Sequence, residues 1–247
     1  MSDDVPTSPD RLSTALPVPR TTLLVLGTMS GVLVATSGIL YTVMEATGGS
    51  QSPLVPVYAL VDVAREFNIA TWFNSSLWLL LAVSTGIVAA HTRKWRFSWI
   101  VFTAIAAIAA LDEFAMLHED LWRLGAQVAS LLGVESLPYS WVAAGLVLVV
   151  VVVAVLAPLM WALPRRILIG YVVAGGIFLL GAIVLETVGG LIEGHFGTVT
   201  WHLALAIHTE ELLEMLGISL AIAVTLSNLR WERTPDGTLT AFAGYRA

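Results

Sequence analysis

The stretch WVAAGLVLVVVVVAVLAPLMWAL, residues 141–163, contains no charged side chain. An α-helix needs about 20 predominantly apolar residues to cross the hydrocarbon of a bilayer, so this segment is long enough to do so. The whole chain has the same character, since 57% of its 247 residues are hydrophobic and 12% are charged. Soluble domains have roughly 25% charged residues, so this composition predicts an integral membrane protein and excludes a secreted or cytosolic enzyme.

Five further apolar stretches have a comparable length. Together with the first they predict six transmembrane helices, at residues 22–46, 70–90, 98–117, 141–163, 167–188 and 202–226. The expected fold class is therefore all-α, a polytopic bundle whose transmembrane domain covers residues 21–228. We expect residues 1–20, with three Asp and four Pro, to form a disordered tail, and residues 229–247 to form a second tail. Apolar residues at helical spacing predict a short amphipathic helix within Gly48–Phe67.

The basic residues predict the orientation, because cytoplasmic loops carry an excess of Lys and Arg. An even number of spans places both termini on one side of the membrane. That side holds all of the 12 basic residues except Arg65 and Arg123. We therefore expect a multi-pass protein of the bacterial cytoplasmic membrane with both termini in the cytoplasm (N-in/C-in), and the lipid bilayer as its partner.

The composition also excludes several classes of site. The chain has no Cys, which rules out disulfides, thiolate ligands, iron–sulfur clusters and cysteine nucleophiles. It has five His, too few for the histidine-rich boxes of membrane hydroxylases. The basic residues form no face with interleaved aromatics, so we expect no nucleic-acid binding.

Acidic residues occur at the ends of three predicted spans, although an ionised side chain at mid-membrane costs at least about 2.5 kcal/mol. They are Asp112, Glu113, Glu119 and Asp120 in the third, Glu186 and Glu193 in the fifth, and Glu210, Glu211 and Glu214 in the sixth. The predicted orientation, which used only basic residues, places all three stretches in the same outer half of the membrane. This agreement predicts that the acids meet.

Helix geometry selects among them, because positions seven apart differ by only about 20° around the axis. Asp112 and Glu119 share one stripe, and Glu186 and Glu193 share another. In the sixth span His208, Glu211 and Glu214 follow at steps of three. The metal ligands that we expect are Asp112, His118, Glu119, Glu186, His208, Glu211 and Glu214. Glu113, Asp120 and Glu210 are interpreted as partners or interface groups. For Glu45, Asn68 and Asn74, which lie toward the outer side, two interpretations stay open: groups that support the ligands, or polar residues of the membrane interface.

Uncompensated carboxylates this close must take up protons or bind a cation. Helix bundles in which facing helices contribute Glu and His hold di-iron or di-manganese pairs. An oxygen-rich set with some imidazole favours iron or manganese, and zinc less specifically. We therefore expect a divalent transition metal, with iron favoured. The usual pair of Glu-x-x-His units is missing, since the single i+3 pair is His208-x-x-Glu211. A b-type haem on His118 and His208 stays as a minor alternative.

Three functions remain open. A di-iron centre would support an oxidoreductase acting on a lipophilic substrate from the bilayer, and a single zinc would support a hydrolase. The acids could instead serve a proton- or divalent-cation-handling transporter or sensor, or a structural polar network without a ligand. Residues 100–110 and 216–225, in the inner halves of the third and sixth spans, are almost wholly apolar, which counts against translocation.

Two strings carry a resemblance to known sequences. Leu-Asp-Glu-x4-His-Glu at 111–119 and Glu-Glu-Leu-Leu-Glu-Met-Leu-Gly at 210–217 resemble those of a family of uncharacterised bacterial multi-pass membrane proteins. The resemblance implies that these two segments matter in the membrane domain. It implies no particular activity or metal.

Overall fold

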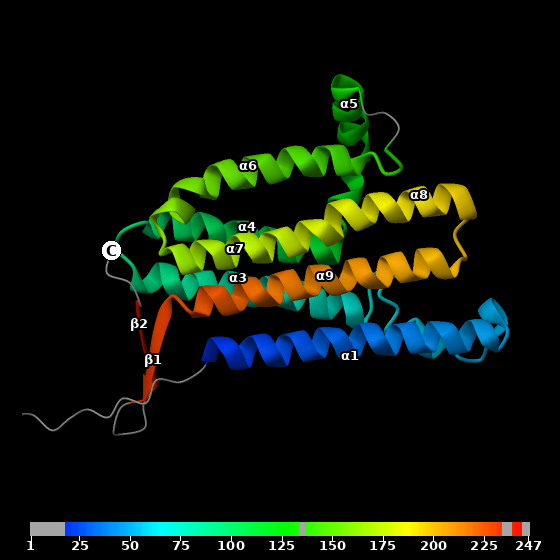
Figure 1. Ribbon diagram of the computed structural model, residues 1–247, viewed down its shortest axis with the longest axis horizontal. Helices are drawn as coiled ribbons and strands as arrows, with labels where there is room; N and C mark the ends of the chain where they lie inside the picture. Colours follow the sequence, from blue (N-terminus) through cyan, green and yellow to red (C-terminus); the bar gives the residue numbers. More distant parts are fainter. Residues whose placement is uncertain (1–17, 134–136, 234–238, 244–247) are drawn as a thin grey trace, which may run out of the picture.

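The computed structural model describes residues 18–133, 137–233 and 239–243, and these form a bundle of long helices with a small β-hairpin at one end (Figure 1). The long helices are α1 (Val18–Ala46), α3 (Ile69–His91), α4 (Arg96–Ala115), α6 (Trp141–Ala162), α7 (Arg165–Leu179), α8 (Glu186–Phe196) and α9 (Trp201–Leu226). A π-helical segment, η3 (Leu180–Leu185), joins α7 to α8 without a break. The short elements are η1 (Gly49–Gln51), α2 (Val55–Tyr58), η2 (Glu119–Leu121) and α5 (Trp122–Leu132).

Five of these helices are long and apolar enough to cross a membrane. They are α1, α3, α4, α6 and the continuous helix of α7, η3 and α8, which covers Arg165–Phe196. The expected all-α membrane bundle is thus confirmed in its coarse form. The expected sixth span coincides with α9, which has 26 residues but carries Glu210, Glu211 and Glu214 and is not among those five.

Local capping explains where two of the long helices begin. The Asn68 side chain accepts hydrogen bonds from the backbone N–H groups of Ala70 and Thr71, which fixes the start of α3. The Thr200 hydroxyl accepts from the Leu203 N–H at the start of α9. Each cap satisfies donors that the first helical turn leaves without an intrahelical partner.

Helix α9 is the central element of the bundle, since it contacts α1, α3, α7, η3 and α8. Glycines permit the close approach of α7 and η3. A Cβ at Gly217 would lie 2.7 Å from the Phe178 backbone nitrogen, and one at Gly181 would lie 2.8 Å from the Glu210 carbonyl oxygen. Small residues at such crossings allow helices in membranes to pack backbone against backbone.

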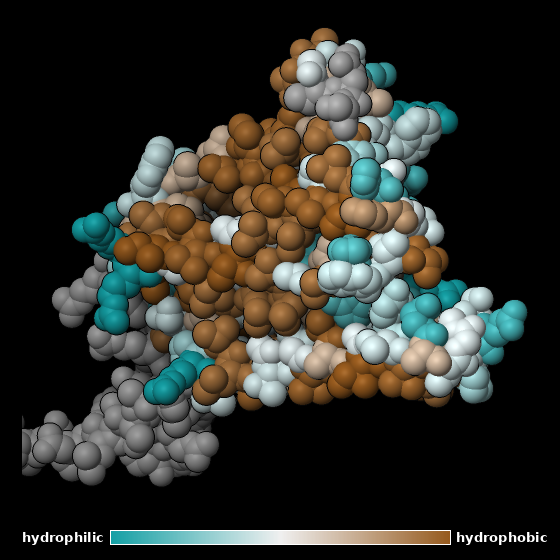
Figure 2. All heavy atoms as spheres, turned by 45° about the vertical axis from the view of Figure 1, so that its right-hand side comes forward, coloured by the Kyte–Doolittle hydropathy of each residue, from teal (hydrophilic) through white to brown (hydrophobic). Residues whose placement is uncertain are grey.

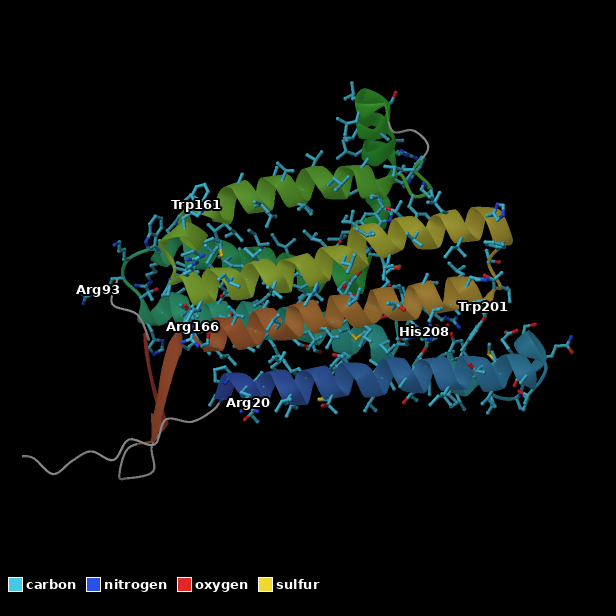
Figure 3. The ribbon with its side chains drawn as sticks, in the orientation of Figure 1. Arg20, Arg93, Trp161, Arg166, Trp201 and His208 are labelled. Carbon is cyan, nitrogen blue, oxygen red and sulfur yellow. The ribbon has the colours of Figure 1, made fainter. Side chains whose placement is uncertain are left out.

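The surface has the pattern of a membrane protein. In Figure 2 a brown apolar belt lies between two regions with teal hydrophilic side chains. Large apolar side chains of α6 are exposed within the bundle's outer surface, among them Leu148 at 56% and Val150 at 67%. In Figure 3 Arg20, Arg93 and Arg166 lie toward one end of the bundle, here named the basic end, and Trp201 lies toward the other. The half toward Trp201 is named the acidic half.

Three segments differ from the sequence-based expectation. The stretch 48–67 contains only the four-residue helix α2 and the three-residue η1, not a longer amphipathic helix. Residues 122–132, expected as a loop, form α5. Within the expected C-terminal tail, β1 (Leu229–Arg233) pairs antiparallel with β2 (Leu239–Ala243), with Leu229 opposite Ala243. The expected disordered tail at 1–20 lies almost wholly outside the described residues.

Candidate functional site

Six glutamates from different elements of the fold gather in the acidic half, and we name them the glutamate cluster. They are Glu66 after α2, Glu113 on α4, Glu186 at the start of α8, and Glu210, Glu211 and Glu214 on α9. The charged neighbours that act most strongly on Glu211 are Glu214, Glu113 and Glu66, followed by Glu186. Those acting on Glu214 are Glu113, Glu186 and Glu66. The cluster is therefore made of carboxylates that face carboxylates.

A pair of neighbouring carboxyl groups joins α8 to α9. Glu186 and Glu210 lie within reach of each other, and Glu210 is only 8% exposed. A hydrogen bond between two carboxyl groups needs a proton on one of them, because an ionised carboxylate can only accept. Trp141 Nε1–H at the start of α6 donates to Glu186 Oε1 over 3.3 Å. The pair is thus bounded by a neutral donor on α6.

A second contact in the cluster leaves a buried acceptor open. Asn74 on α3 donates from Nδ2 to Glu113 Oε1 over 2.7 Å, and the Asn74 side chain is 1% exposed. Its Oδ1 has no hydrogen-bond partner among the described residues. A buried acceptor without a donor costs free energy, and such an atom in a native protein usually marks a missing water or ion. The Asn74 amide therefore offers one neutral oxygen beside the carboxylates.

The π-helical segment η3 forms the wall of the cluster behind Glu210 and Glu214. A Cβ at Gly181 would lie 2.9 Å from Glu214 Cγ, so the backbone of η3 touches the acid-bearing turn of α9. One extra residue per turn in a π-helix shifts the register of the helix beyond it, and such segments occur frequently at functional sites. Here Glu186 is the first residue after it.

Asp112 and His118 form a pair of their own at the end of α4. Asp112 Oδ1 accepts from the His118 backbone N–H over 2.7 Å, and Oδ2 lies 3.1 Å from His118 Nδ1. The turn between them passes through Met116, which has a positive φ of 53°. The His118 ring lies 4.9 Å from the Trp141 ring. Trp141 therefore contacts both this pair and Glu186.

His208 on α9 is engaged on both ring nitrogens. Nδ1 lies 2.7 Å from the Ala204 carbonyl oxygen and so carries the proton, because a carbonyl can only accept. Nε2 then accepts from the Ser37 hydroxyl of α1 over 3.0 Å, and Ser37 Oγ accepts from the Val63 N–H over 3.3 Å. These bonds hold the imidazole between α9 and α1 (Figure 3).

Tyr139, in the loop before α6, and Glu193, on α8, lie beside the cluster. The Tyr139 hydroxyl donates to Glu193 Oε2. Burial raises the pKa of Tyr139, and the hydrogen bond and charge of Glu193 raise that pKa further. The contact ties the loop before α6 to α8.

The predicted ligands therefore divide into separate groups. Glu186, Glu211 and Glu214 lie in the glutamate cluster, whereas Asp112 and His118 pair with each other and His208 pairs with Ser37. The side chain of Glu119 lies outside the part that the structure describes. Among the described residues, no group of three or more His, Asp or Glu side chains is arranged so that it could hold a metal ion.

Sequence reasoning missed one member of the cluster and gave two others a lesser role. Glu113 and Glu210 were expected to be partners of the ligands. In the structure Glu113 accepts a hydrogen bond from Asn74, and Glu210 lies beside Glu186. Glu66 lies in a loop of polar sequence, where nothing distinguishes it from a solvated side chain. Its Oε2 accepts from the Thr71 hydroxyl over 2.9 Å. The adjacent pair Asp112-Glu113 was the available signal for Glu113.

An apolar layer separates the cluster from the basic end. The side chains one to three turns beyond Asn74 and Glu214 are fully buried and apolar: Leu77 at 0%, Leu81 at 2%, Met215 at 0%, Ile218 at 1% and Ile222 at 2% exposed. Buried hydroxyls interrupt this layer at Ser219 on α9 and follow Leu81 on α3 at Ser84 and Thr85. Farther along, Tyr171 lies 2.9 Å from Thr225 Oγ1. The cluster therefore lies in the acidic half, next to a largely apolar layer.

Comparison with known proteins gives one match. A family model described as Domain of unknown function (DUF8692) matches residues 23–229, which include all the long helices except the first five residues of α1. No curated protein and no solved structure matches the chain.

Proposed function

The chain belongs to the family described as Domain of unknown function (DUF8692), and we propose that it is an integral membrane protein with a one-sided cation site formed by the glutamate cluster. The observation that carries the proposal is the convergence of the other glutamates on Glu211 and Glu214, with an open acceptor on Asn74. Carboxylates brought together in this way need protons or a bound cation.

The proposal includes a topology of six spans with both termini in the cytoplasm of a bacterial cell. Helix α9 is the sixth span, because it lies among the apolar helices and packs against α1, α3 and α7. The position of Arg20, Arg93 and Arg166 toward one end supports a cytoplasmic basic end (Figure 3). The acidic half then faces the outside of the cytoplasmic membrane.

The favoured occupant is a divalent transition metal, with iron first and manganese or zinc as alternatives. Glu113, Glu186, Glu211 and Glu214 would supply carboxylate oxygens, and Asn74 Oδ1 would supply a neutral one. Such a set suits iron or manganese better than softer metals. Binding would displace protons from the carboxyl groups of the cluster, since ligands must be deprotonated. An iron centre here would support oxidation of a lipophilic substrate that enters from the bilayer.

A second candidate is a proton sensor that uses the same acids without a metal. The proximity of Glu186 and Glu210 favours it, because two neighbouring carboxyl groups can share one proton. The largely apolar layer around Met215 and Ile218, interrupted by the Ser219 hydroxyl, counts against a transporter, since few buried polar groups lie between the cluster and the basic end in the described residues.

Elemental analysis of detergent-purified protein tests the metal proposal. We expect about one or two equivalents of transition metal per chain, as in other carboxylate centres of helix bundles. Glu211→Gln and Glu186→Gln should lose most of this metal. Glu45→Gln is the matched control, because Glu45 lies on α1, is exposed and is not part of the cluster.

The outcomes separate the two candidates. Metal retained by the wild type and by Glu45→Gln, but lost from the cluster variants, supports the metal site. Folded wild-type protein that stays free of transition metal after growth and purification in its presence contradicts the metal site and leaves the proton sensor as the function.

A further inference from the structure

Helix α5 stands apart from the bundle. It covers the 11 residues Trp122–Leu132 and runs crosswise to the long helices, next to the start of α6 (Figure 1). Its contacts are made with α6 and η2. In the proposed topology the long helices follow the membrane normal, so a helix that runs crosswise to them lies along the membrane surface.

One narrow face of α5 is fixed to the bundle. Gly125 and Ala129, one turn apart, are its buried residues. A Cβ at Gly125 would lie 2.0 Å from the Ser140 carbonyl oxygen, so only glycine fits there. The Ser140 hydroxyl donates to the Trp122 carbonyl oxygen over 3.0 Å. The position of α5 is therefore set by the first turn of α6.

The rest of α5 has two faces of opposite character. Arg123, Gln127 and Ser130 follow at spacings of four and three, form one stripe and are exposed. On the other side Leu124 is 50%, Leu131 is 86% and Leu132 is 61% exposed. A helix with one polar and one apolar exposed face is suited to a boundary between water and an apolar phase.

We propose that α5 is an interfacial helix that lies in the outer leaflet, with its leucine face among the acyl chains and its Arg123 face in water. Three observations select lipid as the occupant. The helix is parallel to the membrane plane, it sits where α4 ends and α6 begins, and its leucine face continues the exposed apolar surface of α6, where Leu146 is 43% and Leu148 is 56% exposed. In Figure 2 this projection carries brown atoms next to the brown belt.

Trp122 and Arg123 agree with this placement. The Arg123 guanidinium carbon lies 5.1 Å from the centre of the Trp122 ring, and Trp122 is 54% exposed. Tryptophan is enriched at the headgroup level of bilayers, and a cation over its ring keeps the charge near the surface.

The contact between α5 and Ser140 also connects α5 to the glutamate cluster. Ser140, which holds α5, is followed by Trp141, and Trp141 donates to Glu186 and packs against His118. The depth of α5 in the leaflet therefore sets the height of Trp141, and with it the level of the cluster relative to the lipid headgroups.

Site-directed spin labelling tests the placement of α5, independently of any metal. The natural chain has no Cys, so single Cys variants carry one label each. Nitroxides at residues 124, 128 and 131 sample the leucine face, and those at 123, 127 and 130 sample the polar face. Leu148→Cys on α6 is the lipid reference and Arg166→Cys at the basic end is the aqueous reference. The measured quantity is the accessibility of each nitroxide to two relaxation reagents. Accessibility to dissolved oxygen is high in lipid, and accessibility to a water-soluble nickel chelate is high in water.

The protein is placed in vesicles of phosphatidylglycerol and phosphatidylethanolamine. We expect labels at residues 124, 128 and 131 to have the same reagent accessibility as Leu148→Cys. Labels at residues 123, 127 and 130 should have the same reagent accessibility as Arg166→Cys. Equal access of the nickel chelate to both faces would place α5 in water and overturn the proposal. Leucine-face labels closed to both reagents would also overturn it, because a protein partner would then cover that face. Three positions on each face keep the result clear if one variant folds poorly.

Discussion

Glu186 on α8 and Glu210 on α9 bring two carboxyl groups together. We expect the two groups to share a proton, so infrared spectra of the wild type at neutral pH should contain the C=O band of a protonated carboxyl group. Glu210→Gln should weaken this band, since the amide can donate without a proton on Glu186. Glu45→Gln should leave it unchanged. A wild-type spectrum without the band would contradict the shared proton.

Replacing Gly217 tests the contact that places the acids of α9 against α7. The Cβ of Gly217→Ala would lie 2.7 Å from the Phe178 backbone nitrogen. We expect a loss of about 1–3 kcal/mol in the free energy of unfolding, the usual cost of overpacking, measured by thermal unfolding in detergent. Gly175→Ala is the control on α7, because its Cβ would meet no atom within 4 Å. Equal melting temperatures for the two variants would refute the close crossing.

Ionisation of Tyr139 should lower the stability of the folded protein at alkaline pH. Its folded-state pKa is raised above the ordinary value of 10.0, mainly by burial and then by Glu193, so the fold favours the neutral phenol. Its contribution to stability is present below pH 10 and is lost as the pH rises above that value. Tyr139→Phe should melt earlier at neutral pH but lose less stability between neutral and strongly alkaline pH.

Part of that alkaline slope should survive in Tyr139→Phe, because burial and a hydrogen bond to Asp62 also raise the pKa of Tyr58. The double variant Tyr139→Phe, Tyr58→Phe should flatten the profile further. Profiles of wild type and Tyr139→Phe that run parallel through the alkaline range would show that Tyr139 does not act in this way.

The proposed orientation is tested with reporter fusions. A reporter that is active only in the cytoplasm should work after Lys94, next to Arg93 at the basic end. A reporter that is active only outside should work after Val128 on α5. The reverse pattern would overturn the topology and would place the glutamate cluster toward the cytoplasm.

Much of the fold could be predicted from the sequence, because apolar length controls where a chain can cross a bilayer. The helices α3 and α6 begin within a residue of the expected starts at 70 and 141. Helix α5 was missed because its leucines are interrupted by Arg123 and Gln127 and it is too short to span. The hairpin of β1 and β2 follows the last span, where ten residues of mixed polarity gave no clear period of two.

The site was harder to predict because helical periodicity gives faces but not partners. Glu211 and Glu214 were placed in one stripe, and they do lie with the other glutamates. His208 follows the same spacing, yet its Nε2 accepts from Ser37 of α1, a residue whose importance no local pattern signals. Glu66 comes from a loop whose return to the bundle depends on tertiary packing. Spacing selects the correct helix turns, while the contacts between elements decide which side chains meet.

Proton release on metal binding tests the central claim most directly. Protein stripped of metal and then titrated with Fe²⁺ under anaerobic conditions, in two buffers of different ionisation enthalpy, should bind the ion and release protons, because the carboxyl groups of the cluster must give up theirs. Glu210→Gln should release fewer, and Glu45→Gln should match the wild type. The account predicts saturable binding coupled to proton release; no binding, or binding without any released proton, would contradict it.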